Sequence, residues 1–397
     1  MTNQIHQFNF PTRIQYGSGA VKLVPDALAV AGRKRPLVVT DKGLGPLPPV
    51  TETVKLMDQG GLATAVFSGV WGNPVKSQVD AGVAAFRAHN ADAIVAIGGG
   101  AAIDVAKAIA LMAHHPGELF DYEDGKPDAR PMDRELPYYV AIPTTAGTGS
   151  EVGRSAVVSD DVTKIKKIIF SPRLLAQRVF VDPDLTMALP ANITAATGMD
   201  AVTHLVESYL ARGFHPMCDG IAREGLRLAA VHLPRVVDYA HRIAGGEKAL
   251  LNDDGHREAR GMMLNAAMMG AVAFQKGLGV THSLAHALGT VCDLHHGLAN
   301  GIMIPYAMTF NAETVPRRLA DLALDVGAAE ATPAGFVRWL EDLRAQIGIA
   351  PTLGAAGVER GQLERLVEVA TADSCHQNNP RACEAKDLRE MFSRALA

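Results

Sequence analysis

The chain has 397 residues, of which 48% are hydrophobic and 20% charged, and its formal net charge is −4. This composition excludes a disordered or collagen-like chain, and the length predicts about two to three domains. Because no basic stripe occurs, nucleic acid is excluded as an expected partner. The 14 histidines greatly outnumber the 4 cysteines, and there is no C-x-x-C motif. A bound metal would therefore be held by histidine and carboxylate rather than by thiolate.

The N-terminal stretch, residues 1–17, carries polar and aromatic residues. It lacks the basic region and the apolar region that define a secretory signal peptide. No window of the sequence approaches the 18 or so uninterrupted apolar residues of a transmembrane helix. We therefore expect a cytoplasmic protein that does not enter a membrane.

The first half of the chain alternates strand-like with helix-like segments. Helical patterns cover residues 79–89 and 101–113. Strands that alternate with helices of this length are typical of an α/β domain with a mainly parallel sheet. The predicted strands are short, apolar and rich in β-branched residues: 37–40, 63–67, 92–97, 138–143, 165–170 and 178–182.

After Pro190 the pattern changes to long stretches rich in Ala, Leu and Met, with apolar residues at helical spacing. Prolines between residues 183 and 190 mark the change. We predict an α/β domain over 1–189 and an all-helical domain over 190–397. The predicted helical stretches of the second domain are 196–212, 218–243, 255–275, 280–292, 316–347 and 359–372.

Two loops that follow predicted strands have the composition of a nucleotide site. Residues 98–100 are three glycines that open a helix, where free backbone N–H groups suit a pyrophosphate. The alternative is a tight turn, and the G-x-G-x-x-G fingerprint is absent. Residues 143–151 offer hydroxyls and glycines that suit ribose and phosphate oxygens, or else form an ordinary polar loop. Asp41 ends the first predicted strand and would meet a ribose, unless it is a turn residue.

Acidic and histidine residues recur at one-turn spacing in the helical half. Asp200 and His204 are four residues apart, as are His282 and His286, and the pair 295–296 follows. The two residues of each pair spaced by four share a helix face, where they can bind one metal ion together. The alternatives are an Asp–His pair that only stabilises its helix and histidines that cluster on the surface by chance. The residue after His282 is not Glu, so this is not the H-E-x-x-H motif of metalloproteases. One Asp with several neutral His suits Fe²⁺ or Zn²⁺.

A metal site and a nucleotide site in one chain favour a particular chemistry. A metal ion lowers the pKa of a bound alcohol, and the resulting metal-bound alkoxide passes a hydride to a nicotinamide. The metal itself undergoes no redox change in this scheme.

Further short motifs occur in a fixed order along the chain. They are 39–42, 73–74, 98–100 with Asp104 and Lys107, 142–148, 181–183, 195–201 with His204, 279–289, 296–297 with Asn300, and 379–381. In this ordered set the sequence resembles the iron-containing (group III) alcohol dehydrogenases over essentially its whole length. The resemblance implies a dehydroquinate synthase-like fold: an α/β N-terminal dinucleotide-binding domain followed by an all-α C-terminal metal-binding domain.

The resemblance also implies roles for the acidic and histidine residues. His296 rather than His295 would bind metal, because Gly297 follows it as the family pattern expects. His286 would be a catalytic, non-ligating histidine near the nicotinamide that handles a proton. Fe²⁺ is the favoured ion and Zn²⁺ the alternative. The implied metal ligands are Asp200, His204, His282 and His296.

The implied organic cofactor is NAD. The carboxylate of Asp41 would favour NAD over NADP, because it opposes a 2′-phosphate. The implied cofactor-binding residues are Asp41, Asn73, Gly99, Gly100, Thr144, Thr145, Thr148, Lys166 and Leu185.

We therefore expect an NAD-dependent alcohol dehydrogenase that converts an alcohol reversibly to an aldehyde or ketone. Alternatives of the same fold are a 4-hydroxybutyrate-type dehydrogenase, a glycerol dehydrogenase and a maleylacetate-type reductase. In the hydroxy-acid case Lys276 would meet the substrate carboxylate, and otherwise it would point to solvent. A non-catalytic metal- or nucleotide-binding protein is the alternative of another class. The expected partners are a small alcohol or aldehyde and a second copy in a homodimer or larger homo-oligomer.

Overall fold

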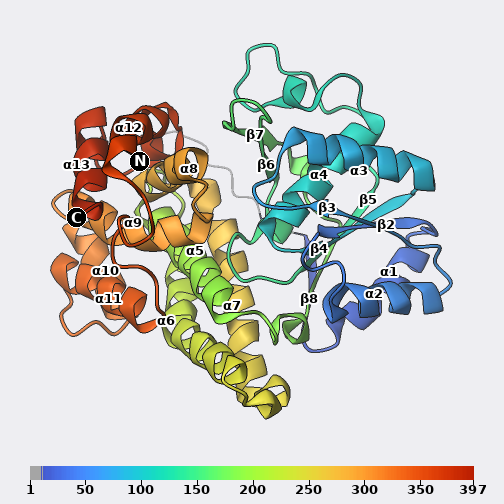
Figure 1. Ribbon diagram of the computed structural model, residues 1–397, viewed down its shortest axis with the longest axis horizontal. Helices are drawn as coiled ribbons and strands as arrows, with labels where there is room; N and C mark the ends of the chain where they lie inside the picture. The colour runs from blue at the N-terminus through green and yellow to red at the C-terminus, as the bar shows by residue number, and fades with distance from the viewer. Residues whose placement is uncertain (1–9, 11) are drawn as a thin grey trace. The chain divides into compact units, whose positions relative to one another are not determined.

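The computed structural model describes Phe10 and residues 12–397, which divide into two compact units (Figure 1). The α/β unit comprises residues 12–145 and Gly149–Met187, and the helical unit comprises Phe10, Ala146–Thr148 and Ala188–Ala397. An α/β half followed by a helical half is confirmed. The signal-peptide expectation concerned residues 1–17, and residues 1–9 and 11 lie outside the described part.

The α/β unit is built on a six-stranded sheet in which every pairing is parallel, with strand order β1-β8-β5-β4-β2-β3. All residues of β4 are buried, which explains its continuous apolar sequence. The chain runs from β2 outward to β3 and returns to the other side of β2 for β4. Doubly wound sheets bind ligands at such a reversal. The strands are β1 (Arg13–Tyr16), β2 (Pro36–Asp41), β3 (Ala65–Val70), β4 (Ala93–Gly98), β5 (Tyr138–Pro143) and β8 (Arg178–Val181).

Four helices cover the two faces of this sheet, α1 and α2 on one face and α3 and α4 on the other (Figure 1). A separate antiparallel hairpin pairs β6 (Ser155–Ser159) with β7 (Lys166–Phe170). The sequence patterns predicted β7 but not β1, β6, α1 or α2, because these segments are short or carry mixed polar and apolar residues. The helices are α1 (Val24–Val30), α2 (Pro48–Gln59), α3 (Lys76–His89) and α4 (Gly100–His114).

The helical unit packs nine α-helices of the described residues around a core of aliphatic side chains. The predicted stretch 316–347 is two helices, because Gly327, with φ +69°, ends the first. The patterns missed α9 and α13. The helices are α5 (Ala191–Leu210), α6 (Pro216–Ala244), α7 (Asp254–Ala273), α8 (Val280–Cys292), α9 (His296–Asn311), α10 (Pro316–Asp325), α11 (Pro333–Gln346), α12 (Leu363–Ala372) and α13 (Ala385–Ala395).

Short 3₁₀ helices join these elements. They are η1 (Ala20–Leu23), η2 (Leu119–Tyr122), η3 (Ser150–Val152), η4 (Pro172–Leu174), η5 (Pro183–Thr186), η6 (Lys248–Asn252), η7 (Phe274–Lys276), η8 (Arg360–Gln362) and η9 (Cys375–Asn378). Across the described residues, none of the helices has the length and apolar character needed to cross a membrane.

Helix α5 lies at the centre of the helical unit, and every residue from Gly198 to Leu210 is buried. Its acidic and histidine residues therefore require partners, because an unpaired buried charge is costly. Helix α9 approaches α5 closely at Gly297. A Cβ atom there would overlap the main-chain carbonyl of Ala196, which cannot rotate away. Glycine at this position thus permits the contact that brings the first turn of α9 against α5.

Substituting Gly297→Ala tests this close contact. We expect it to lower the free energy of unfolding by about 1–3 kcal/mol, because the new methyl group must push two packed helices apart. Gly220→Ala is the matched control. It adds the same methyl group within helix α6, where nothing lies within 4 Å, and should stabilise the protein by about 0.5–1 kcal/mol. Urea denaturation of both variants measures the difference. Equal stabilities would contradict the tight α5–α9 contact.

Candidate metal centre and nucleotide site

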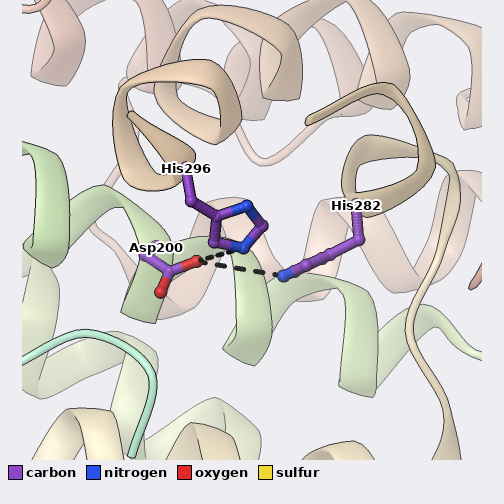
Figure 2. A group of neighbouring side chains, drawn as sticks. All are labelled: Asp200, His282 and His296. Carbon is purple, nitrogen blue, oxygen red and sulfur yellow. Dashed lines mark ion pairs between the residues drawn. The ribbon is translucent and has the colours of Figure 1, made fainter. Parts of the chain in front are cut away.

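Three of the predicted ligands come together from three different helices. Asp200 of α5, His282 of α8 and His296 of α9 offer ligand atoms that all lie within 4.8 Å of one another. The Oδ1 atom of Asp200 is 3.4 Å from Nε2 of His296 and 3.9 Å from Nε2 of His282. Figure 2 shows both imidazole rings directed at this carboxylate. The arrangement converges on one point, as a metal site requires.

His204 lies one helical turn after Asp200 and borders the same group. Its Nε2 is 3.9 Å from Oδ1 of Asp200, and its ring stacks on that of His282 with 4.7 Å between centroids. Burial lowers the pKa of His204 to about 4. The ring is therefore neutral at pH 7, which is the form that binds a metal. His295, by contrast, is exposed.

A buried carboxylate that the sequence patterns did not single out orients His282. Glu207 of α5 is 2% exposed, and its Oε2 accepts a hydrogen bond of 2.7 Å from Nδ1 of His282. Its oxygens also accept from the main-chain N–H groups of Gly279 and Thr281, at 2.8 and 2.6 Å. Glu207 thus caps the start of α8 and also fixes the orientation of the His282 ring. Such carboxylate–histidine contacts orient metal ligands.

The hydrogen-bond pattern of His282 tests whether the site suits a cation. Because Nδ1 carries the proton shared with Glu207, the lone pair lies on Nε2. That Nε2 atom is buried and has no hydrogen-bond partner among the described residues. Burial lowers the pKa of His282. The hydrogen bond and the negative charge of Glu207 together raise it by more than burial lowers it, so the net shift of the pKa is upward. The site therefore favours positive charge at this position, and a divalent metal supplies it.

Asn300 holds the carboxylate of the group. It lies one turn after His296 on α9, and its Nδ2 donates to Oδ1 of Asp200 at 2.8 Å. The same Nδ2 lies 3.2 Å from Nε2 of His296. These contacts explain why Asn300 belongs to the sequence motif, because they hold Asp200 of α5 in place beside His296 of α9.

His286 lies beside the group but is bonded elsewhere. Its Nδ1 is 2.7 Å from Oδ2 of Asp373, and its ring stacks on His296 with 5.3 Å between centroids. Burial raises the pKa of Asp373, but the neighbouring His286 and further hydrogen bonds hold it well below its usual range. An ionised Asp373 fixes the Nδ1–H tautomer and leaves Nε2 as the proton acceptor.

Glu207 and Asp373 are the site residues that sequence reasoning missed. A signal for Glu207 existed, because it lies three residues after His204 and seven after Asp200 on the same helix face. For Asp373 there was none, since it is far from His286 in the sequence and only the packing of η9 against α8 joins them.

The predicted nucleotide residues of the α/β unit gather at the carboxyl ends of neighbouring strands. Asp41 ends β2, Gly99 and Gly100 follow β4, and Thr144 and Thr145 follow β5. The N–H of Thr144 donates to Gly98 at 3.0 Å, so the two loops are joined. A Cβ atom at Gly99 would lie 3.0 Å from Oγ1 of Thr145. A side chain at this position would crowd Thr145, and glycine leaves the backbone there uncovered.

The remaining predicted cofactor residues lie around this edge or apart from it. Asn73 follows β3, and Leu185 follows β8 in η5 and packs against the core. Lys166 begins β7 in the hairpin, opposite Ser159. Thr148 groups with the helical unit instead. The α/β unit therefore contains all of the predicted cofactor residues except Thr148.

Asp104 and Lys107 of the same motif have a structural role in fixing the second loop. The Oδ1 atom of Asp104 accepts from the hydroxyl of Ser150, and Oδ2 accepts from the N–H of Val157 at 3.0 Å. The buried Nζ of Lys107 donates to the hydroxyl and carbonyl of Ser150 and to the carbonyl of Ser155. Helix α4 thereby anchors the chain that leaves the hydroxyl-rich loop.

The interpretation that Lys276 points to solvent was wrong. The residue is 8% exposed, and its Nζ donates to Oδ1 of Asp219 at 2.5 Å and to the carbonyl of Tyr209 at 2.8 Å. Asp219 also accepts from Arg318. Lys276 is therefore shielded from solvent, and its ammonium is paired within the protein. It joins η7 to α5 and α6.

A doubly wound nucleotide unit followed by a helical unit with an Asp/His metal group defines the class of metal-dependent dehydrogenases. Profiles of this class match the chain: "Iron-containing alcohol dehydrogenase" over residues 11–183, and "Fe-containing alcohol dehydrogenase family, C-terminal" over residues 194–396. The chain belongs to the iron-containing alcohol dehydrogenase family. It is therefore an NAD-dependent oxidoreductase of alcohols that uses a divalent metal.

Individual relatives match along their whole length. The chain is 37% identical to the 4-hydroxybutyrate dehydrogenase of Cupriavidus necator, with 97% of this chain and 98% of that protein covered. It is 36% identical to the NAD-dependent methanol dehydrogenase of Bacillus methanolicus, with both chains fully covered. The crystal structure of a 1,3-propanediol oxidoreductase superposes with a TM-score of 0.89 at 33% identity, covering 98% of this chain and 100% of that one.

The substitution Glu207→Gln tests the role of the buried carboxylate. We expect metal affinity to fall about 10–100-fold, because the amide cannot accept from His282 and from both main-chain N–H groups at once. Chelator competition followed by metal analysis measures the affinity. Glu341→Gln, at an exposed position of α11, is the control and should bind metal normally. Unchanged affinity in a folded Glu207→Gln protein would contradict the orienting role.

Proposed function

We propose that this chain oxidises an alcohol to an aldehyde or ketone with NAD, reversibly, at a divalent metal held by Asp200, His204, His282 and His296. The observation that carries the assignment is the buried Nε2 atom of His282, which faces Asp200 with no hydrogen-bond partner among the described residues. When bound, a divalent ion supplies Lewis-acid chemistry that makes an alcohol hydroxyl more acidic.

The protein's own residues then handle the proton. We assign this role to His286, because Asp373 holds the ring and keeps its Nδ1 protonated. The opposite nitrogen, Nε2, is left with a lone pair that accepts the hydroxyl proton. NAD, when bound, would supply the acceptor for the hydride from the carbon atom of the alcohol. Asp373 does not touch the substrate and acts only by positioning His286.

The α/β unit binds the dinucleotide in this proposal. Gly99 and Gly100 meet the pyrophosphate at the start of α4, where the helix dipole favours an anion. Thr144, Thr145 and Thr148 line the dinucleotide, and Asn73, Lys166 and Leu185 complete the site. The carboxylate of Asp41 accepts from the adenosine ribose and excludes a 2′-phosphate.

An uncharged alcohol is the substrate class that we propose. The names of the relatives include uncharged alcohols, such as methanol, the cationic alcohol choline, and the hydroxy acid 4-hydroxybutyrate. Lys276 was the residue expected to meet a carboxylate, and its ammonium is already paired with Asp219. We further propose that the enzyme is cytoplasmic and forms a homodimer or larger homo-oligomer, with Fe²⁺ as the metal. Gel filtration and metal analysis of the purified protein test these points.

Loss of the proposed metal ligand Asp200 provides the test of function. We expect Asp200→Ala to lose both bound metal and NAD reduction with every alcohol, because the carboxylate is the ligand nearest the centre of the group. Metal analysis and NADH absorbance are measured on the same samples, with 1,3-propanediol, methanol and 4-hydroxybutyrate as substrates. Asp342→Ala, exposed on α11, is the control. Activity that survives without metal would refute the proposal.

The substitution Asp41→Asn tests the nucleotide preference. The amide keeps the acceptor that holds the N–H of Leu44, at 2.8 Å, and removes the charge. Two like charges about 4 Å apart cost ~1–4 kcal/mol, so the preference for NADP relative to NAD should rise at least about fivefold. Steady-state kcat/KM for both nucleotides measures the ratio, with exposed Asp58→Asn as control. A wild-type enzyme that uses both nucleotides equally would contradict the role of Asp41.

A further inference from the structure

A second group of potential metal ligands lies in the helical unit beside the first. Three residues offer ligand atoms that all lie within 4.8 Å of one another: His286 of α8, Asp373 at the end of α12, and Cys375 of η9. None of these residues belongs to the proposed ligand set of the first group. All three side chains are half-buried, so solvent reaches them.

The carboxylate of Asp373 fixes the geometry of this second group. Its Oδ2 is 2.7 Å from Nδ1 of His286, and its Oδ1 accepts from the hydroxyl of Ser283 at 2.7 Å and from the N–H of Cys375 at 2.8 Å. The Ser283 hydroxyl in turn accepts from the N–H of His376 at 2.9 Å. The start of η9 is therefore held against α8, and the thiol-bearing residue stays next to the imidazole.

We propose that His286, Asp373 and Cys375 form a second cation site, specific for a thiophilic ion such as Zn²⁺. One thiolate, one imidazole and one carboxylate are ligands that Zn²⁺ accepts, with bond lengths of about 2.0–2.3 Å. In a tetrahedral site such ligand atoms lie roughly 3.5 Å apart. Small side-chain rotations bring the three atoms from their present spacing to that value.

Binding at this site balances as a simple exchange of protons for metal. The ion takes the lone pair of Nδ1 and the Oδ2 atom of Asp373, which now share a proton. That proton moves to Nε2 of His286, and the thiol of Cys375 releases its proton to solvent as the metal–sulfur bond forms. No oxidation or reduction takes place.

The site has a consequence for catalysis that rests on the proposed function. With an ion on Nδ1, Nε2 of His286 carries a proton and no longer accepts one from the alcohol. Occupation therefore inhibits the enzyme without displacing the metal of the first group. Zn²⁺ in excess should act as an inhibitor through Cys375.

Cobalt distinguishes the two sites, because only the second contains sulfur. A Co²⁺–thiolate bond gives a strong charge-transfer absorption in the near ultraviolet, and a site of nitrogen and oxygen ligands does not. We expect metal-free wild-type protein titrated with CoCl₂ to bind about two ions per chain and to develop this absorption. Cys375→Ser should bind about one ion and lack the absorption.

Cys292→Ser is the matched control, because Cys292 is also half-buried and lies on α8, the helix that carries His286. It should behave as wild type. Cys375→Ala, melted alongside Cys375→Ser, separates lost binding from lost folding. Absence of the absorption in saturated wild-type protein, or its persistence in a folded Cys375→Ser, would overturn the site.

Inhibition is measured separately on protein whose first site is filled. We expect the ZnCl₂ concentration that halves activity to rise at least about tenfold in Cys375→Ser. If Co²⁺ shows the second site but Zn²⁺ inhibits both proteins equally, the site stands and the proposed proton role of His286 fails.

Discussion

The buried carboxylate of Glu207 is the interaction on which the helical unit's site depends. It accepts two main-chain N–H groups at the start of α8 and the Nδ1–H of His282. A helix N-terminus and an imidazole both require an acceptor when water is excluded, and one side chain satisfies them together. The position at which α8 begins and the direction of the His282 ring are therefore set by the same charge. That charge also favours a cation at the far side of the ring.

In the rest of the centre, too, a small number of polar side chains is enclosed by closely packed apolar helices. Asp200, His204 and Glu207 lie on successive turns of α5, so one buried face supplies both proposed ligands of this helix and the carboxylate that orients His282. Asn300 and Gly297 of α9 make that helix fit α5, one by a hydrogen bond and one by the absence of a side chain. The carboxylate of Asp200 and the ring of His282 are thus each held by a residue of another helix.

Local patterns predicted those parts whose signal lies within a few residues. Strand β4 could be predicted from the sequence, because a buried parallel strand is continuously apolar. The glycines after it could be recognised because a phosphate-binding loop needs small residues. The one-turn spacing of Asp200 and His204 could be recognised because both residues lie within one short segment of the sequence. Short β1 and the hairpin strand β6 could not be predicted, because edge strands carry mixed residues. Lys276 was misjudged, because its partners Asp219 and Tyr209 come from other helices.

The sequence by itself determined the class of fold and the family, and it predicted which residues would bind the metal and the nucleotide. These properties depend on residue type and local spacing, which are present in the chain before it folds. The tertiary structure alone decided which acids support the histidines, that Lys276 is paired internally, and that Cys375 lies beside His286 and Asp373. Those contacts join segments distant in the sequence, and they form only when helices pack and buried polar groups must find partners.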